Sequence, residues 1–375
     1  MSQQQDQQQP YQHKQHQQNN AVQPVEIEAG AKRILETMLA QQSDAWNLSL
    51  SHWDWSQGVG LYGISRMYEW TRDEAYLCFL RDWFRQHAGL RQFGSVNYVC
   101  LANSALMLLK LEKELPEQEA VLYRSICEEF ADWCLNKALL TANGGFAHVW
   151  GKGGLDDYKN QLWIDTVFMA GIFMIDYGLH AGRPELVEEG IRQYEIHAGC
   201  LYNPETGLFY HGYHSLHHKQ LGEHWGRGNG WMAAALAELL RLLQGTRYDT
   251  GMFSSMFLSF MESAYRLRNE DGMLHTVLNL KSSYTETTAT ALFGYAALLG
   301  AELGILPETI KEWGHQASQQ VLRRITLLGE VEGASGGTDC QELEGYLHIP
   351  FIQSLYTYGT VLMVLAAELH SPNSR

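Results

Sequence analysis

The sequence carries a helical pattern of apolar residues from about residue 25 almost to its end, with nearly no alternating strand pattern. Glycine-rich stretches separate the segments that carry it. About twelve helices are expected, over residues 26–41, 56–71, 73–87, 98–114, 117–138, 162–181, 184–198, 230–244, 249–268, 286–303, 308–326 and 352–369. A chain with so many helices and so few strands must bury its core between helices, which predicts an all-α domain.

The expected helices are of two kinds. Residues 166–175 are apolar nearly all round, whereas residues 185–197 have a charged face. A helix buried on every side belongs to an inner layer, and a helix with a charged face belongs to an outer one. The alternation predicts an (α/α)6 barrel of about twelve helices in two shells, forming a single catalytic domain over residues 25–375. Substrate is expected where loops and inner-helix ends converge.

The first 24 residues differ from this domain, because they are crowded with Gln, His and Asn and have no apolar core of a secretory signal. They predict a disordered tail and a cytoplasmic protein. The six cysteines include no CxxC pair, which argues against a disulfide or zinc role, and no metal or cofactor is expected.

Charge limits the partners of the chain. Its 42 acidic and 27 basic residues give a net charge of -15, which argues against nucleic acid and anionic membranes. No stretch reads as a membrane span. An anionic small substrate therefore needs locally placed cations, and the oligomeric state stays open.

The segment Trp225-Gly-Arg-Gly-Asn-Gly-Trp231 sets one guanidinium between two indoles. Arg227 can hold a carboxylate through two N–H groups, and the faces of Trp225 and Trp231 suit the C–H side of a sugar ring. Asn229 is a candidate N-cap for the helix expected from residue 230. The competing interpretation is a capped helix with two core tryptophans.

Asp165 is a single carboxylate in the otherwise apolar run of residues 161–170. An ionised carboxylate is costly to bury without a partner, and the apolar neighbours Trp163 and Phe168 favour its protonated form. Asp165 is therefore the candidate general acid. The alternative is that it caps the helix that follows.

Four further residues are candidates for the same site. Trp53 and Trp55 can form a sugar platform, although Ser56 as an N-cap would give that segment a structural role. His148 lies in the segment Gly144-Gly-Phe-Ala-His148, and the sequence supports a substrate contact and a structural role for it equally. His211 is expected on a short hairpin near Arg227.

Taken in their order along the chain, these motifs resemble those of glycoside hydrolase family 105, the unsaturated glucuronyl and rhamnogalacturonyl hydrolases. The resemblance covers about residues 30 to 370, and its motifs lie at residues 225–231, 161–170, 144–148, 208–213, 286–291, 336–338 and 346–350. It implies an (α/α)6 barrel that removes the non-reducing 4,5-unsaturated uronate which polysaccharide lyases leave, most simply on pectin or rhamnogalacturonan fragments. Asp165 would then protonate C4 of the enol ether, and water would add at C5. The substrate contacts that the resemblance implies are His148, His211, Trp225, Arg227 and Trp231.

Two positions depart from the family. The second aspartate that the family usually has is replaced by Asn97, which can orient a water or a hydroxyl but cannot act as a base. His214 stands where the family often has an acid, which suggests an altered substrate. Two alternatives stay open: a sugar epimerase using His148 and His211 as paired histidines, and a catalytically inactive carbohydrate-binding homologue, suggested by Asn97.

Overall fold

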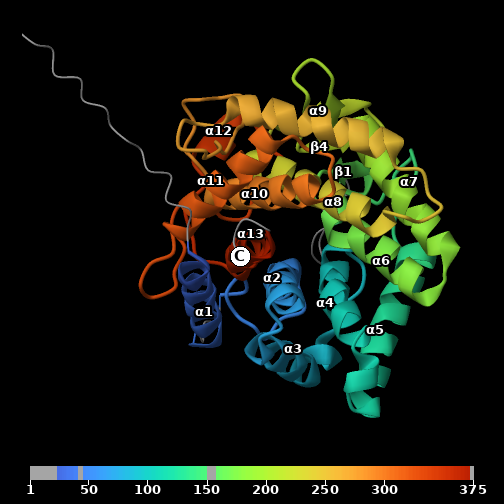
Figure 1. The fold of residues 1–375 in the computed structure, drawn as a ribbon. Helices are drawn as coiled ribbons and strands as arrows, with labels where there is room; N and C mark the ends of the chain where they lie inside the picture. The colour runs from blue at the N-terminus through green and yellow to red at the C-terminus, as the bar shows by residue number, and fades with distance from the viewer. Residues whose placement is uncertain (1–22, 41–44, 150–157, 372–375) are drawn as a thin grey trace, which may run out of the picture.

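The computed structural model describes residues 23–40, 45–149 and 158–371, and in them helices form two concentric layers (Figure 1). The inner layer consists of α2 (Trp55–Thr71), α4 (Cys100–Leu109), α6 (Ile172–Ala181), α8 (Gly226–Leu243), α10 (Thr287–Glu302) and α13 (Leu355–His370). Each inner helix contacts the next, and α13 packs against α2 to close the ring. The chain is therefore a closed barrel in which its first and last inner helices are neighbours.

The outer layer consists of α1 (Pro24–Ala40), α3 (Glu74–His87), α5 (Glu117–Asn136), α7 (Pro184–Leu201), α9 (Gly251–Leu267) and α11 (Glu308–Leu322). Helices α3, α5, α7, α9 and α11 each pack on the inner helix that precedes them, and α1 packs on α13. Every residue of the inner helix α4 is buried, whereas α3 buries only one face, as the two patterns of hydrophobicity require. The predicted (α/α)6 barrel is confirmed.

Two glycines allow α2 and α13 to pack closely where they close the ring of inner helices. A Cβ atom built on Gly63 of α2 would lie 2.6 Å from the Cα of Gly359 in α13. The two helices therefore approach backbone to backbone, which no larger side chain at either position permits.

Small sheets and short helices lie between the long helices. β1 (Gln161–Trp163), β4 (Gly212–His214) and β5 (Lys219–Leu221) form an antiparallel sheet in the order β1-β4-β5, and β2 (Tyr202–Asn203) pairs with β3 (Leu208–Phe209). Within the sheet, Trp163 lies opposite Gly212. The short helices are η1 (Ala88–Leu90), η2 (Val96–Val99), η3 (Glu112–Glu114), η4 (Tyr158–Asn160), the π-helical turn η5 (Val167–Gly171) and α12 (Leu343–Leu347). Strands of two or three residues are too short to show a period in the sequence.

The helix expected over residues 162–181 is interrupted at its start. It begins with strand β1, and the π-helical turn η5 precedes the regular helix α6. Single π-helical turns frequently mark functional sites. The expected helix over residues 98–114 is likewise divided into η2, α4 and η3.

The expected N-cap role of Asn229 is wrong. Helix α8 begins at Gly226 with Trp225 at the cap position, so Asn229 lies inside the first turn. Its side-chain amide instead donates to the carbonyls of Phe209 and Trp225, and its oxygen accepts from the backbone N–H of Phe209. Asn229 thus joins α8 to the short hairpin β2-β3.

Helix α1 begins at Pro24, the last residue of the predicted tail, and residues 1–22 lie outside the described part of the chain. All six cysteines lie in the described part, and all are free thiols. None of the described helices has the length and apolar character needed to cross a membrane.

Candidate active site

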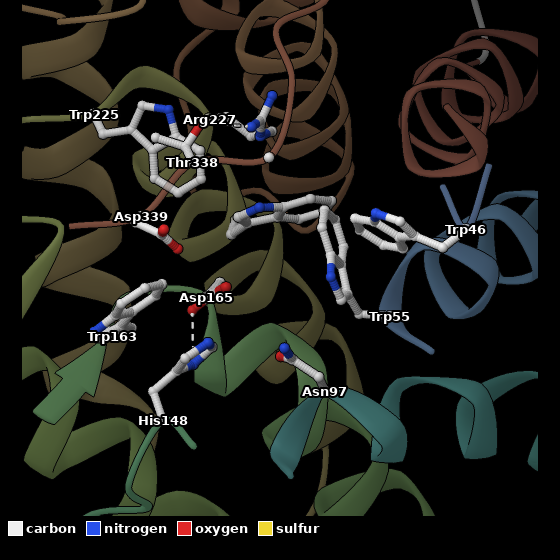
Figure 2. A pocket seen from close by; sticks show the side chains of 12 residues that line it. Trp46, Trp55, Asn97, His148, Trp163, Asp165, Trp225, Arg227, Thr338 and Asp339 are labelled. Atoms are coloured by element: carbon white, nitrogen blue, oxygen red, sulfur yellow. Dashed lines mark hydrogen bonds and ion pairs between the residues drawn. The ribbon is translucent and has the colours of Figure 1, made fainter. Parts of the chain in front are cut away.

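A cavity of about 160 Å³ opens among the N-terminal ends of the inner helices (Figure 2). One water needs only about 10 to 15 Å³ on the same measure, so the cavity has room for a sugar ring. Its lining residues are Trp46, Trp55, Asn97, His148, Trp163, Asp165, Trp225, Arg227, Trp231, Gly337, Thr338 and Asp339. Four of them mark the helix starts: Trp55 begins α2, Asn97 precedes α4, Asp165 precedes α6, and Arg227 lies in the first turn of α8. Helix N-termini carry positive partial charge, which favours an anionic ligand here.

Seven of the nine residues predicted for the site line this cavity, whereas His211 and Trp53 do not. The His211 ring is fully buried, and its centroid lies 4.3 Å from that of Trp225. Its Nδ1 lies 2.6 Å from the hydroxyl of Tyr346. Burial lowers the pKa of His211 well below its usual value, and the charges of His148 and Arg227 lower it further. His211 is therefore a neutral side chain that supports the Trp225 wall.

Asp165 presents a carboxylate to the cavity. The side chain is 14% exposed, and its Oδ1 lies 3.5 Å from Nδ1 of His148 without any hydrogen-bond partner in the described structure. The backbone carbonyl of Asp165 accepts from the N–H groups of Phe168 and Met169, but its side chain makes no capping bond, and Thr166 holds the cap position. The alternative interpretation of Asp165 as a helix cap is wrong, and the carboxylate is free to meet a ligand.

His148 is fixed beside Asp165 by stacking. Its ring lies 4.2 Å from the ring of Trp163 at an interplanar angle of 6°, and its backbone N–H donates to the carbonyl of Gln161. Burial lowers the pKa of His148 below its usual value, although the carboxylates of Asp165 and Asp339 act in the opposite direction. The imidazole is therefore neutral at neutral pH and can act as a hydrogen-bonding group toward a substrate.

Arg227 is 1% exposed, and its guanidinium already holds the segment 335–338. Nη1 donates to the carbonyl and hydroxyl of Ser335 at 2.8 and 2.9 Å, and Nη2 donates to the carbonyl of Gly336 and the hydroxyl of Thr338 at 2.5 and 2.9 Å. Glu286 Oε1 lies 3.6 Å from Nη1. The two-pronged contact expected for a substrate carboxylate is thus occupied within the protein, whereas Nε of Arg227 has no hydrogen-bond partner in the described structure.

Glu286 has the capping role that its place before an apolar helix indicates. Its carboxylate accepts from the N–H of Ala289 at the start of α10, and its other oxygen accepts from the backbone N–H of Ser335. Glu286 therefore ties the start of α10 to the segment that Arg227 holds.

Indole rings wall the cavity on several sides. Trp225 lies under the Arg227 guanidinium at 4.8 Å, and Trp55 stacks on Tyr356 with centroids 4.7 Å apart. Trp46 is 39% exposed and lies 5.7 Å from Trp55. Figure 2 shows Trp46 and Trp55 across the cavity from Asp165. Aromatic faces on two sides suit the apolar faces of consecutive sugar rings.

Trp53 is not part of the platform expected with Trp55. It is fully buried, stacks on Phe130 at 5.8 Å, and donates its Nε1–H to the carbonyl of Tyr98. The N-cap of α2 also differs from the expectation, because Asp54 and not Ser56 occupies that position. Neighbouring tryptophans therefore divide, one into the core and one into the cavity.

Asn97, the residue that the resemblance sets in place of a second aspartate, lines the cavity. Only 4% of the residue is exposed, and its Oδ1 has no hydrogen-bond partner in the described structure. Ser95 orients the segment by accepting from the backbone N–H of Asn97. A buried amide oxygen of this kind is a ready acceptor for a hydroxyl or a water.

The sequence interpretation missed Trp46 and Asp339. Asp339 directly follows the motif Gly336-Gly-Thr338, so a carboxylate beside a glycine-containing motif was the available signal. In the described chain, no group of three or more His, Cys, Asp and Glu side chains is placed to hold a metal ion.

The chain is similar to known glycoside hydrolases in sequence and in fold. The family model described as Glycosyl Hydrolase Family 88 matches residues 30–371. An unsaturated rhamnogalacturonyl hydrolase, YesR of Bacillus subtilis, is 29% identical over 303 residues, which cover 80% of this chain and 84% of that protein.

Solved structures are similar over nearly the whole chain. A possible member of the GH105 family from Salmonella enterica is 25% identical with a TM-score of 0.86, covering 96% of this chain and 98% of its own. The unsaturated glucuronyl hydrolase of Bacillus sp. GL1, 16% identical with a TM-score of 0.70, covers 92% of this chain and 95% of its own and shares the fold. The chain therefore belongs to Glycosyl Hydrolase Family 88.

Proposed function

We propose that the protein removes a 4,5-unsaturated uronate from the non-reducing end of lyase-generated oligosaccharides. The observation that carries the proposal is the Asp165 carboxylate, which faces a tryptophan-walled cavity with Arg227 beside it. The family and the name of the Bacillus subtilis relative support the same substrate class.

The reaction needs an acid that protonates carbon. Asp165 gives its proton to C4, and the electrons of the C4=C5 double bond form the new C–H bond. Positive charge then develops on C5 and the ring oxygen, and water adds at C5. The resulting hemiketal opens, and the aglycone sugar leaves. Because the chemistry starts at a double bond, the carboxylate spacing that distinguishes retaining from inverting glycosidases does not apply.

Each wall of the cavity has a role in binding. Trp225 and Trp231 pack against the uronate ring, and Asn97 and His148 bond its hydroxyls. Arg227 and the helix N-termini attract its carboxylate. The aglycone sugar extends toward Trp46 and Trp55.

Two other functions fit the site less well. An epimerase with paired histidines needs both of them at the substrate, but only His148 lines the cavity and His211 is buried. A catalytically inactive binding protein is less well supported, because the Asp165 carboxylate lines the cavity and the relative that matches most of the chain is named as a hydrolase.

The test is an assay of unsaturated disaccharides from pectin, rhamnogalacturonan and glycosaminoglycan lyases, followed by the loss of enol-ether absorbance. We expect turnover of at least one, most simply of the rhamnogalacturonan type, and no effect of a metal chelator. Saturated disaccharides of the same linkage are the control. Stable absorbance with every unsaturated substrate would refute the proposal.

The six free thiols suit a reducing compartment, so we infer a cytoplasmic enzyme.

A further inference from the structure

A second carboxylate, Asp339, lines the same cavity as Asp165. Figure 2 shows Asp339 on the side of Trp225 and Thr338, with its carboxylate toward Asp165, whereas Asn97 lies on the opposite side. The charges of Asp165 and Asp339 both act on the buried His148, and both act on Cys340. The cavity is therefore lined by two acids, Asp165 and Asp339, and by the amide of Asn97.

The two carboxylates have different surroundings. Asp165 is 14% exposed and lies beside His148, whereas Asp339 is exposed to solvent. An acid that gives a proton and a base that takes one are commonly placed in unlike environments within one site. The exposed carboxylate is the one that a solvent water can reach.

The segment before Asp339 is held firmly. Arg227 donates to Ser335, Gly336 and Thr338, and the N–H of Gly336 donates to the carbonyl of Pro350 at 2.9 Å. A base must be held in position to be effective. The guanidinium of Arg227 thus has a second use, because it fixes the backbone that carries Asp339.

We propose that Asp339 is the base of the hydration step, a role that Asn97 cannot fill. This inference rests on the proposed function. After Asp165 has protonated C4, a water held by Asp339 attacks C5 with its oxygen lone pair. The C–O bond forms, and the water proton passes to the Asp339 carboxylate. Asp339 then returns this proton to solvent, and Asp165 takes one up for the next cycle.

The test compares Asp339→Asn and Asp339→Ala with wild type on an unsaturated disaccharide that the wild type consumes. Glu342→Gln is the matched control, because Glu342 is an exposed acid three residues later that does not line the cavity. We expect both Asp339 variants to lose about 100-fold or more in kcat, as general-base removal does. KM should not rise, since a negative charge near an anionic substrate has been removed. Glu342→Gln should behave as wild type.

Chemical rescue separates a base from a structural residue. Added formate should restore kcat of Asp339→Ala at least about fivefold by supplying a carboxylate in the space left, and it should not rescue Asp165→Asn. A kcat of Asp339→Asn within about threefold of wild type overturns the inference and leaves the proposed function standing. A raised KM with a lowered melting temperature and no rescue shows a structural role and also overturns it. If the wild type consumes no unsaturated disaccharide, both proposals fail.

Discussion

Arg227 and Glu286 form a buried ion pair beneath the cavity, with Nη1 and Oε1 3.6 Å apart and side chains that are 1% and 0% exposed. Both also bond Ser335, Arg227 through the carbonyl and Glu286 through the backbone N–H. Three segments distant in the sequence therefore meet at one residue. Breaking such a pair leaves an uncompensated buried charge, so the segment before Asp339 depends on both partners.

Replacing Arg227 by Lys tests the role of its planar guanidinium. A single ammonium cannot hold Ser335, Gly336 and Thr338 together, and it presents its charge differently to a substrate carboxylate. We expect KM for the unsaturated disaccharide to rise roughly 10- to 100-fold, equivalent to about 1.5 to 3 kcal/mol. Steady-state kinetics measure KM, and thermal unfolding shows whether the fold is kept. An unchanged KM would mean that Arg227 does not contribute to carboxylate binding.

Asp165→Asn should abolish turnover, because the amide keeps the shape of the side chain but has no proton to give. Substrate affinity, measured by calorimetry with the uncleaved disaccharide, should stay within about tenfold of wild type. Residual activity above about a tenth of the wild-type rate would show that another group is the acid.

Asn97 should act through hydrogen bonding and not through proton transfer. Asn97→Ala removes the unpaired buried oxygen from the cavity and should lower kcat/KM about tenfold or more. Asn97→Asp adds a negative charge near the substrate carboxylate and should raise KM. Wild-type kinetics in both variants would place Asn97 outside the substrate contacts.

Trp46 is expected to contact the aglycone sugar. Trp46→Ala should raise KM for disaccharides about three- to tenfold, since aromatic packing of this kind contributes about 0.5 to 1.5 kcal/mol. Trp46→Phe, which keeps an aromatic face, is the matched variant, and its KM should lie between those of wild type and Trp46→Ala. For a small unsaturated uronate glycoside that lacks the second sugar, KM of Trp46→Ala should equal that of wild type. A similar rise in KM for this substrate would contradict the assignment.

The stability of the barrel should fall at mildly acidic pH because of buried histidines. Burial lowers the pKa of His197 from 6.5 to about 4. A histidine whose pKa is depressed by folding contributes stability above its unfolded pKa, and this contribution is lost as pH falls from 6.5 toward 4. At pH 5 the loss for His197 is about 2 kcal/mol. Burial also lowers the pKa of His148 and His211, which adds to the loss in the same direction.

Urea unfolding at pH 7 and pH 5 measures this effect. His197→Asn should show a smaller difference in unfolding free energy between the two pH values than wild type, whatever its absolute stability. The exposed His52→Asn is the control and should keep the wild-type difference. Equal differences in wild type and His197→Asn would show that His197 does not titrate as its burial requires.

The sequence by itself determined the two layers of helices, because helical periodicity and the presence of a charged face are local properties that each segment carries alone. It also pointed to one of the two acids that line the cavity, because Asp165 is the carboxylate of an apolar run, whereas Asp339 was missed. The strands, the π-helical turn and the start of α8 were not determined in this way. Their boundaries depend on bonds to distant segments, such as the N–H of Gly226 donating to the carbonyl of Thr276.

Only the tertiary structure decided which side chains share the cavity. Trp53 and Trp55 are two residues apart in the sequence, yet Trp53 packs against Phe130 in the core, whereas Trp55 begins α2 at the cavity. His211 is buried behind Trp225, and Asp339 reaches the space of Asp165 because Arg227 and Glu286 hold the segment before it. These placements follow from the closing of the ring by α13 on α2, which brings the ends of inner helices from the whole chain to one place.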